Sequence, residues 1–177
     1  RNTAVIFGDG AGAVVVGATT EDRGVLSTHL HSDGKYAKEL WLKEPSTTSS
    51  NRLSKESIER GDHFLSMNGR EVFRHAVKRF PEAINESLEH NGLTTEDISL
   101  LIPHQANLRI SDMIQKKMNL PDNKVYNNIE KYGNTTAASI PICLSEAKEK
   151  GLISDNDLVV CAAFGAGFLW GSAIIRW

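Results

Sequence analysis

Residues 158–177 read LVVCAAFGAGFLWGSAIIRW, and this stretch decides the fold class. Two apolar runs, Leu158 to Phe164 and Ser172 to Trp177, flank a glycine-rich connection. Such runs, short and bounded by turn residues, are typical of buried strands. Another apolar run, Ile98 to Ile102, predicts a further buried strand earlier in the chain.

Three helices are predicted alongside these strands. Apolar residues keep helical spacing across residues 69–91, about 107–118 and about 135–150. Further strands are predicted at Gly24–Asp33, Glu39–Lys43 and Val125–Tyr126, and a polar surface excursion at 45–62. Strands that alternate with long helices indicate an α/β fold, here a layered sheet sandwiched by helices.

The first residues also resemble strands. Ala4–Phe7 and Ala13–Val16 are apolar, and they flank the loop Gly8-Asp9-Gly10-Ala11-Gly12. A glycine loop after a strand can bind a dinucleotide, but that site needs a helix directly after the glycines. Strand-like residues follow instead, so we favour a tight glycine turn between two strands.

Composition excludes several classes of protein. The 177 residues are 40% hydrophobic and 24% charged, with a net charge of -2, as in ordinary globular proteins. This near-neutral balance argues against generic binding to nucleic acid or to a membrane surface. No apolar run approaches the roughly 20 residues of a membrane helix. Two cysteines provide no disulfide framework and fit a reducing, cytoplasmic compartment.

The histidines are candidate metal ligands and the cysteines are candidate nucleophiles. His29 and His31 share one face of a predicted strand, but no third metal ligand has suitable spacing, so no metal site is expected. Cys143 lies in a predicted helix and Cys161 in an apolar strand. Neither is at a helix N-terminus that would lower its pKa, so both are interpreted as buried small apolar residues.

Three junctions carry polar or glycine residues where ligands could bind. Pro103–Asn107 follows a buried strand and opens a helix, and its His104 is as consistent with a structural as with a catalytic role. Tyr132–Ser139 contains Asn134 and, taken alone, favours helix capping. Gly165–Gly167 could offer backbone N–H groups to a negative charge, although a plain hairpin connection is locally the better explanation.

Basic residues recur on two neighbouring predicted helices. Arg70, Arg74 and Lys78 are spaced by four residues, and Arg109, Lys116 and Lys117 add positive charge on the next helix. A charged helix face is usually only solvated. Its clustering on an otherwise acidic chain also fits the docking of an acidic partner.

Taken together, these motifs resemble the β-ketoacyl-[acyl carrier protein] synthase III family. In chain order they are Gly8–Ala13, Met67–Phe73, Pro103–Arg109, Tyr132–Ser139 and Phe164–Gly171. The resemblance covers essentially the whole chain, but only the C-terminal half of a family member. It implies a thiolase-like fold, with residues 1–23 ending the first half and residues 24–177 forming the second.

The resemblance also implies an activity. Such an enzyme, a cytoplasmic homodimer without cofactors, joins an acyl-CoA primer to malonyl-acyl carrier protein in the first condensation of fatty-acid synthesis. Its nucleophilic cysteine lies in the first half, which we expect to be missing from this chain. The chain alone is therefore expected to be inactive. Competing readings are a non-catalytic module that binds carrier protein or coenzyme A, and a related synthase of secondary metabolism.

Individual residues match the family's functional positions. His104 and Asn134 match its catalytic histidine and asparagine, and Phe73 matches a phenylalanine beside the malonyl group. Ala166 stands where the family usually has glycine, and it would be strained only at positive φ. The implied substrate-binding residues are Met67, Gly69, Phe73, Ala76, Asn107, Arg109, Phe164 and Ala166. The implied docking residues for acyl carrier protein are Arg74, Gln105, Arg109, Lys116 and Lys117.

Overall fold

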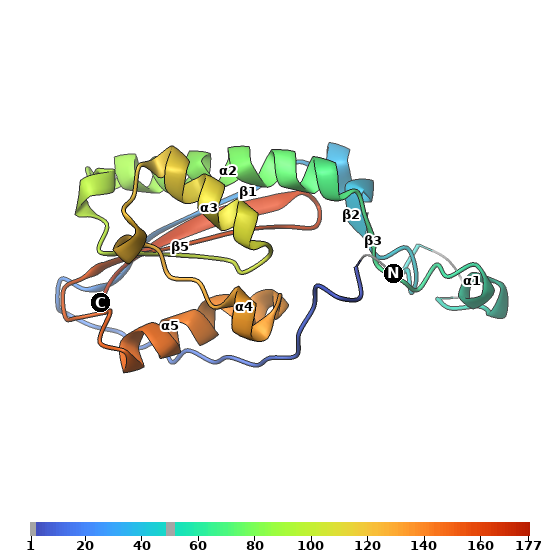
Figure 1. Cartoon of the computed structure of the whole chain (residues 1–177), viewed down its shortest axis with the longest axis horizontal. Helices are drawn as coiled ribbons and strands as arrows, with labels where there is room; N and C mark the ends of the chain where they lie inside the picture. The colour runs from blue at the N-terminus through green and yellow to red at the C-terminus, as the bar shows by residue number, and fades with distance from the viewer. Residues whose placement is uncertain (1–2, 49–51) are drawn as a thin grey trace.

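A computed structural model describes residues 3–48 and 52–177. Its centre is a four-stranded sheet of order β1-β6-β5-β4, and helices cover both faces (Figure 1). The strands are β1 (Gly24–Ser32), β2 (Leu40–Trp41), β3 (Ser66–Met67), β4 (Leu100–Pro103), β5 (Leu158–Gly165) and β6 (Leu169–Arg176). The helices are α1 (Lys55–Glu59), α2 (Gly69–His90), α3 (Leu108–Met118), α4 (Ile129–Tyr132) and α5 (Ser139–Glu149). The predicted layered α/β architecture is confirmed.

Successive side chains of the central strands pack alternately into two hydrophobic clusters, one on each face of the sheet. In β5, Val160 packs with α2 and α3, whereas its neighbours Val159 and Cys161 pack with α5. Successive side chains of a strand point to opposite faces, so an all-apolar strand fills both layers at once. This is why the apolar run 158–164 has no polar alternation.

The strand directions define where a site can form. β4 and β5 are parallel, with Leu100 opposite Val159 and Pro103 opposite Ala162, so their carboxyl ends meet at one edge. β6 returns antiparallel to β5 through a three-residue turn, and β1 pairs antiparallel with β6. The loops that follow β4 and β5 therefore converge.

The predicted helices are present, and their ends follow capping rules. Asn68 and Asn107 accept backbone N–H bonds at the starts of α2 and α3. The third predicted helix, 135–150, is a 3-10 turn, Thr136–Ala138, followed by α5. None of the helices in the described ranges is long and apolar enough to span a membrane.

Several local predictions need correction. Val125 makes only an isolated bridge to Leu101 instead of a strand. The surface excursion at 45–62 contains the short helix α1, and its residues 49–51 lie outside the described residues. β6 begins at Leu169, three residues before the predicted start.

The predicted strands at Ala4–Phe7 and Ala13–Val16 are wrong. Phe7 forms one isolated parallel bridge with Asn134, and residues 8–19 belong to no helix or strand. Val14, Val15 and Val16 are exposed. A strand needs a continuous hydrogen-bonded neighbour, and the described part of the chain offers this segment only the contact with Asn134 and leaves one of its sides uncovered. The segment instead runs along α4 and α5, on the face opposite α2 (Figure 1).

Candidate active site

A large cavity opens at the edge where β4 and β5 end. Its volume is about 1190 Å³, and most of its lining is apolar. His104 directly follows β4, and its backbone N–H donates to the Ala162 carbonyl oxygen of β5 at 2.8 Å. The histidine is thus held at the carboxyl end of the sheet, where α/β folds bind their ligands.

The structure brings the predicted catalytic and substrate-binding residues together around this cavity. They come from β3 and the first half of α2, the β4–α3 connection and the start of α3, the α4–α5 connection, and the end of β5 with the turn after it. These lining residues are Met67, Gly69, Phe73, Ala76, His104, Asn107, Arg109, Asn134, Phe164 and Ala166. Their roles remain predictions, but their proximity is a property of the fold.

The imidazole of His104 is partly buried and makes one hydrogen bond to the described residues. Its Nδ1 lies 2.7 Å from the hydroxyl oxygen of Ser139, the first residue of α5. Burial lowers the pKa of the imidazole, because a low-dielectric environment disfavours the charged form. His104 is therefore neutral at pH 7.

Asn134 is fixed through its backbone and its side-chain oxygen. Its N–H donates to the Ile6 carbonyl and its carbonyl accepts from the Gly8 N–H, both at 3.0 Å. Its Oδ1 accepts the Thr136 backbone N–H at 2.8 Å. Since a backbone N–H can only donate, this contact assigns the amide orientation and leaves the Nδ2 hydrogens for a ligand.

Backbone strain accompanies the Asn134 contact. Thr136 has φ of 53°, in the left-handed region that a β-branched residue rarely adopts. The strained residue is the one whose backbone N–H bonds Asn134 Oδ1. Strain of this kind costs on the order of 1–3 kcal/mol and persists only where the surroundings impose it.

The glycines of the predicted turn have a different use. Gly8, Gly10 and Gly12 alternate along an extended segment and face the chain that carries Asn134. A Cβ at Gly8 would lie 2.0 Å from the Tyr132 carbonyl oxygen, and one at Gly12 would lie 2.4 Å from Pro141 Cβ. The glycines therefore permit close packing against α4 and α5, and the expected tight turn is absent.

Gln105 does not belong to a docking surface, contrary to the expectation from the sequence. Its side chain is 2% exposed. Its Oε1 accepts the N–H groups of Asn128 and Ile129, and its Nε2 donates to the Pro103 carbonyl oxygen. The buried amide thus ties the end of β4 to the start of α4, and it has no free group for a partner.

Glu146 anchors the same loop from α5. Its carboxylate accepts hydrogen bonds from Asn128 Nδ2 at 2.8 Å, Lys131 Nζ at 2.9 Å and the Tyr132 hydroxyl at 2.7 Å. These donors, Asn128 first, lower the pKa of Glu146 to about 2. The carboxylate is therefore charged at neutral pH and holds the connection that leads to Asn134.

The remaining predicted docking residues differ in their surroundings. Arg74 is exposed, and its guanidinium pairs with Glu71 at 2.5 Å. Lys117 Nζ donates to the Val77 carbonyl oxygen at 3.1 Å. That carbonyl lacks its helical partner because Pro81, four residues later, has no N–H. Arg109 and Lys116 are exposed on α3.

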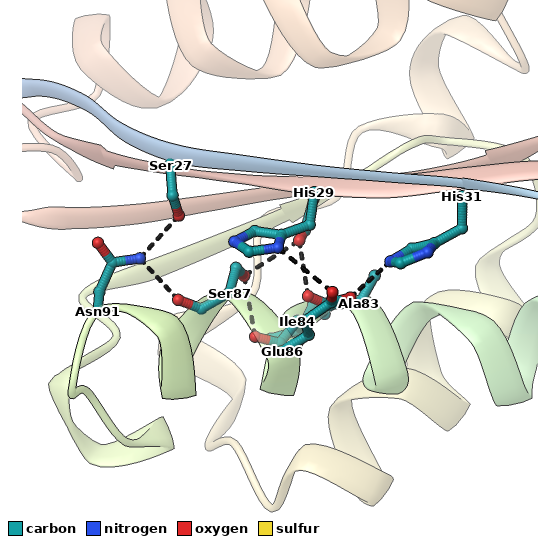
Figure 2. Close-up of polar contacts among 9 residues, drawn as sticks. Ser27, His29, His31, Ala83, Ile84, Glu86, Ser87 and Asn91 are labelled. Carbon is teal, nitrogen blue, oxygen red and sulfur yellow. Dashed lines mark hydrogen bonds and ion pairs between the residues drawn. The ribbon is translucent and has the colours of Figure 1, made fainter.

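Three other features set limits on the chemistry of the site. His29 Nδ1 and His31 Nε2 lie 3.4 Å and 2.5 Å from Glu86 of α2, so both histidines contribute to sheet–helix packing (Figure 2). Within residues 3–48 and 52–177 no three His, Cys, Asp or Glu side chains are arranged to hold a metal ion. Burial raises the pKa of both Cys143 and Cys161 to about 12, so neither is a thiolate at neutral pH.

The β5–β6 turn accommodates alanine at position 166. Ala166 is not among the described residues with positive φ, so its Cβ causes no backbone strain. Phe168, at the tip, is fully buried and packs 4.8 Å from the Phe164 ring, centroid to centroid. The expected hairpin is confirmed, and Gly165 and Ala166 of its turn line the cavity.

Sequence reasoning missed some residues of the site. Ile6 and Phe7 line the cavity, and Ser139 contacts His104, but neither function was predicted for them. Ser139 belongs to the quoted Tyr132–Ser139 motif. Its distance of 35 residues from His104 gives no signal that the two side chains meet.

The arrangement suits one kind of chemistry. A neutral imidazole and an oriented carboxamide line the same apolar cavity, and both carry N–H donors. Donors fixed in a water-poor site stabilise negative charge that develops on a substrate oxygen.

Two family models match the chain. The model described as 3-oxoacyl-[acyl-carrier-protein (ACP)] synthase III C terminal matches residues 88–177, and the one described as 3-oxoacyl-[acyl-carrier-protein (ACP)] synthase III matches residues 1–34. A curated relative, beta-ketoacyl-[acyl-carrier-protein] synthase III of Caldanaerobacter subterraneus subsp. tengcongensis, is 49% identical over 177 residues. The alignment covers 100% of this chain and 53% of that protein.

Solved structures also match this chain over about half of their own length. The synthase III of Thermus thermophilus superposes with a TM-score of 0.89 at 45% identity, covering 100% of this chain and 53% of that one. The priming β-ketosynthase of the R1128 polyketide pathway superposes with a TM-score of 0.73 at 29% identity, covering 86% and 45% respectively. The chain thus spans about half the length of the curated relatives and structures that it matches.

Proposed function

The chain belongs to the 3-oxoacyl-[acyl-carrier-protein] synthase III family, and on that premise we propose that it supplies the His104–Asn134 part of a condensing active site. The complete enzyme would be a β-ketoacyl-acyl carrier protein synthase III that initiates fatty-acid synthesis. It would join an acyl group from acyl-CoA to malonyl-acyl carrier protein. We place this enzyme in the cytoplasm as a homodimer without a cofactor.

The proposed reaction uses the two donors at a defined step. The C–C bond to the malonyl carboxylate breaks, carbon dioxide leaves, and the electron pair forms an enolate whose charge lies on the thioester oxygen. His104 and Asn134 donate N–H bonds to that oxygen. The enolate carbon then attacks the acyl-enzyme carbonyl, a new C–C bond forms, and the cysteine thiolate leaves.

One observation carries this proposal: a neutral histidine and an asparagine whose amide donors are bonded to none of the described residues line the same apolar cavity. Phe73, from the first turns of α2, adds an apolar wall. An apolar wall disfavours a carboxylate and so favours its loss as carbon dioxide.

The nucleophile must come from elsewhere. Both cysteines of this chain are buried, with pKa values raised to about 12. We propose that the nucleophilic cysteine lies in the part of its relatives' length that this chain does not span. The 177-residue chain would then neither accept an acyl group nor condense one.

Docking of acyl carrier protein is assigned to the exposed basic residues near the cavity. Arg109 lines the cavity mouth, and Lys116 continues the positive charge along α3. Arg74 and Lys117 are secondary members, because each already has a partner within the chain. A surface of this sign attracts an acidic partner and loses affinity as salt rises.

The test uses the complete synthase that contains this sequence. His104→Ala and Asn134→Ala should each slow decarboxylation of malonyl-acyl carrier protein by about 10²–10³-fold, the usual cost of one oxyanion donor. Acylation of the cysteine, monitored by mass spectrometry, should be largely unchanged.

Matched controls are His90→Ala and Asn123→Ala, since both residues are exposed and neither lines the cavity. Normal condensation in either site variant would exclude the proposal, and a pure docking module would produce that result.

A second candidate is a synthase that starts polyketide chains, for which the R1128 neighbour provides the observation. The chemistry is shared, and the primer differs. Rates with acyl-CoA primers of increasing length and branching would separate the two. Preference for the primers found in the organism's membrane lipids would support the fatty-acid assignment.

A further inference from the structure

The contact between His104 and Ser139 determines where the imidazole carries its proton. Ser139 is 2% exposed, so its hydroxyl must find partners within the protein. Its oxygen has two neighbours among the described residues: the Gln105 backbone nitrogen at 3.3 Å and His104 Nδ1 at 2.7 Å. The hydroxyl has one hydrogen to donate and can accept two bonds.

The two neighbours are not equivalent. A backbone N–H can only donate, so Ser139 Oγ is the acceptor of the Gln105 bond. In the described structure the remaining partner for the serine hydrogen is His104 Nδ1. If Nδ1 carried a proton instead, that proton would point at Ser139 Oγ and the serine hydrogen would be buried without an acceptor, which is costly.

We infer that Ser139 is a positioning residue: its hydroxyl donates to His104 Nδ1 and so keeps the imidazole proton on Nε2. A histidine nitrogen that accepts a bond leaves the other nitrogen as the donor. Ser139 acts through His104 and does not line the cavity. The tautomer follows from the geometry alone, whereas its catalytic consequence rests on the proposed function of His104.

The same segment prepares both donors. Thr136 fixes the amide of Asn134 through its backbone N–H, and Ser139, three residues later, fixes the imidazole of His104. In both contacts the bonded atom of the site residue is an acceptor, Asn134 Oδ1 or His104 Nδ1. The N–H groups of the two side chains are therefore left to bind a ligand. The segment from Thr136 to Ser139 therefore determines the amide orientation of Asn134 and the tautomer of His104. The residues immediately around these two side chains do not determine them alone.

The direct test is the tautomer of His104 in the ¹⁵N-labelled 177-residue chain. Long-range ¹H–¹⁵N spectra above pH 7 distinguish a protonated from an unprotonated ring nitrogen. The wild-type chain should show Nδ1 unprotonated and Nε2 protonated. Ser139→Ala should convert this single form into a mixture, and Ser139→Thr, which keeps a hydroxyl, should restore it. Ser145→Ala, at an exposed serine of the same helix, should change nothing.

A protonated Nδ1 in the wild-type chain would overturn the inference whether or not any variant folds. An unchanged tautomer in a folded Ser139→Ala chain would also overturn it. Neither result depends on catalysis.

The second arm measures condensation by the complete synthase. Ser139→Ala should reduce the turnover number about tenfold, less than outright loss of the donor, with recovery in Ser139→Thr. Acylation of the cysteine should not change. A shifted tautomer with unchanged condensation would leave the inference intact and count against the proposed role of His104.

Discussion

Two segments of this chain have nearly the same sequence pattern and adopt different structures. Residues 7–16 read FGDGAGAVVV and residues 164–175 read FGAGFLWGSAII. The second forms a hairpin, with Phe164 opposite Trp170 and Gly165 opposite Leu169. The first is an irregular extended segment whose valines are exposed. Apolar and β-branched residues therefore favour a strand without determining one.

The difference lies in what each segment contacts. The hairpin tip is held by reciprocal backbone bonds between Asp33 and Phe168, at 2.8 and 3.0 Å, and its strands lie in the middle of the sheet. The first segment has the bridge to Asn134 and the close approach of its glycines to α4 and α5. A hairpin inside a sheet satisfies its backbone and buries both faces, whereas the first segment has only one side covered.

The largest expected effect is at Gly171 of the hairpin. A Cβ there would lie 2.5 Å from the His29 carbonyl oxygen, so β1 and β6 would have to separate. Gly171→Ala should lower the free energy of unfolding by about 3 kcal/mol, measured by urea denaturation. Gly17→Ala, directly after the first segment, is the control, because nothing lies within 4 Å of its added Cβ. Equal losses in the two variants would remove the distinction between the segments.

A smaller contrast is expected for the valines. Val160 in β5 is 0% exposed and Val15 is 99% exposed. Val160→Ala should cost about 2 kcal/mol of unfolding free energy, because it leaves a cavity in the core. Val15→Ala should stay within about 0.5 kcal/mol. A clear loss in Val15→Ala would indicate that the first segment is covered in solution, for instance by a second molecule.

The smallest expected effect concerns Glu146, which supports the α4–α5 connection that the first segment contacts, and it depends on pH. Glu146 has its pKa lowered to about 2 in the folded chain, below the ordinary glutamate pKa of 4.5. The unfolded state therefore takes up the proton first, and the stabilisation by Glu146 is complete above about pH 4.5 and is lost as pH falls toward 2. Glu146→Gln should cost about 1 kcal/mol at pH 7.

Hydrogen exchange would locate this effect. At pH 7, Glu146→Gln should speed exchange of the Gly8 and Asn134 amides, which bridge the first segment to the α4–α5 connection. Amides of β5 and β6 should be unaffected. Uniform acceleration across the sheet would mean that Glu146 supports the whole fold instead of this contact.

Much of the fold could be predicted from the sequence because its signals are local. Helical spacing over 69–91 and 107–118 located α2 and α3 to within a residue, since one face of each must be buried. The apolar run 158–164 located β5 for the same reason. The order of motifs also indicated the family, and with it His104 and Asn134.

Tertiary contacts decided the rest. The sequence could not show that Gln105 is buried, because a glutamine between His104 and Ala106 is equally suited to a surface. It could not distinguish the two FG-rich segments, because pairing depends on a partner strand remote in sequence. Nor could it place the Ser139 hydroxyl beside His104 Nδ1, since 35 residues of chain must fold before the two atoms meet. Residue types and periodicity specify which face of an element is buried, whereas hydrogen-bond direction is determined only when distant elements pack together.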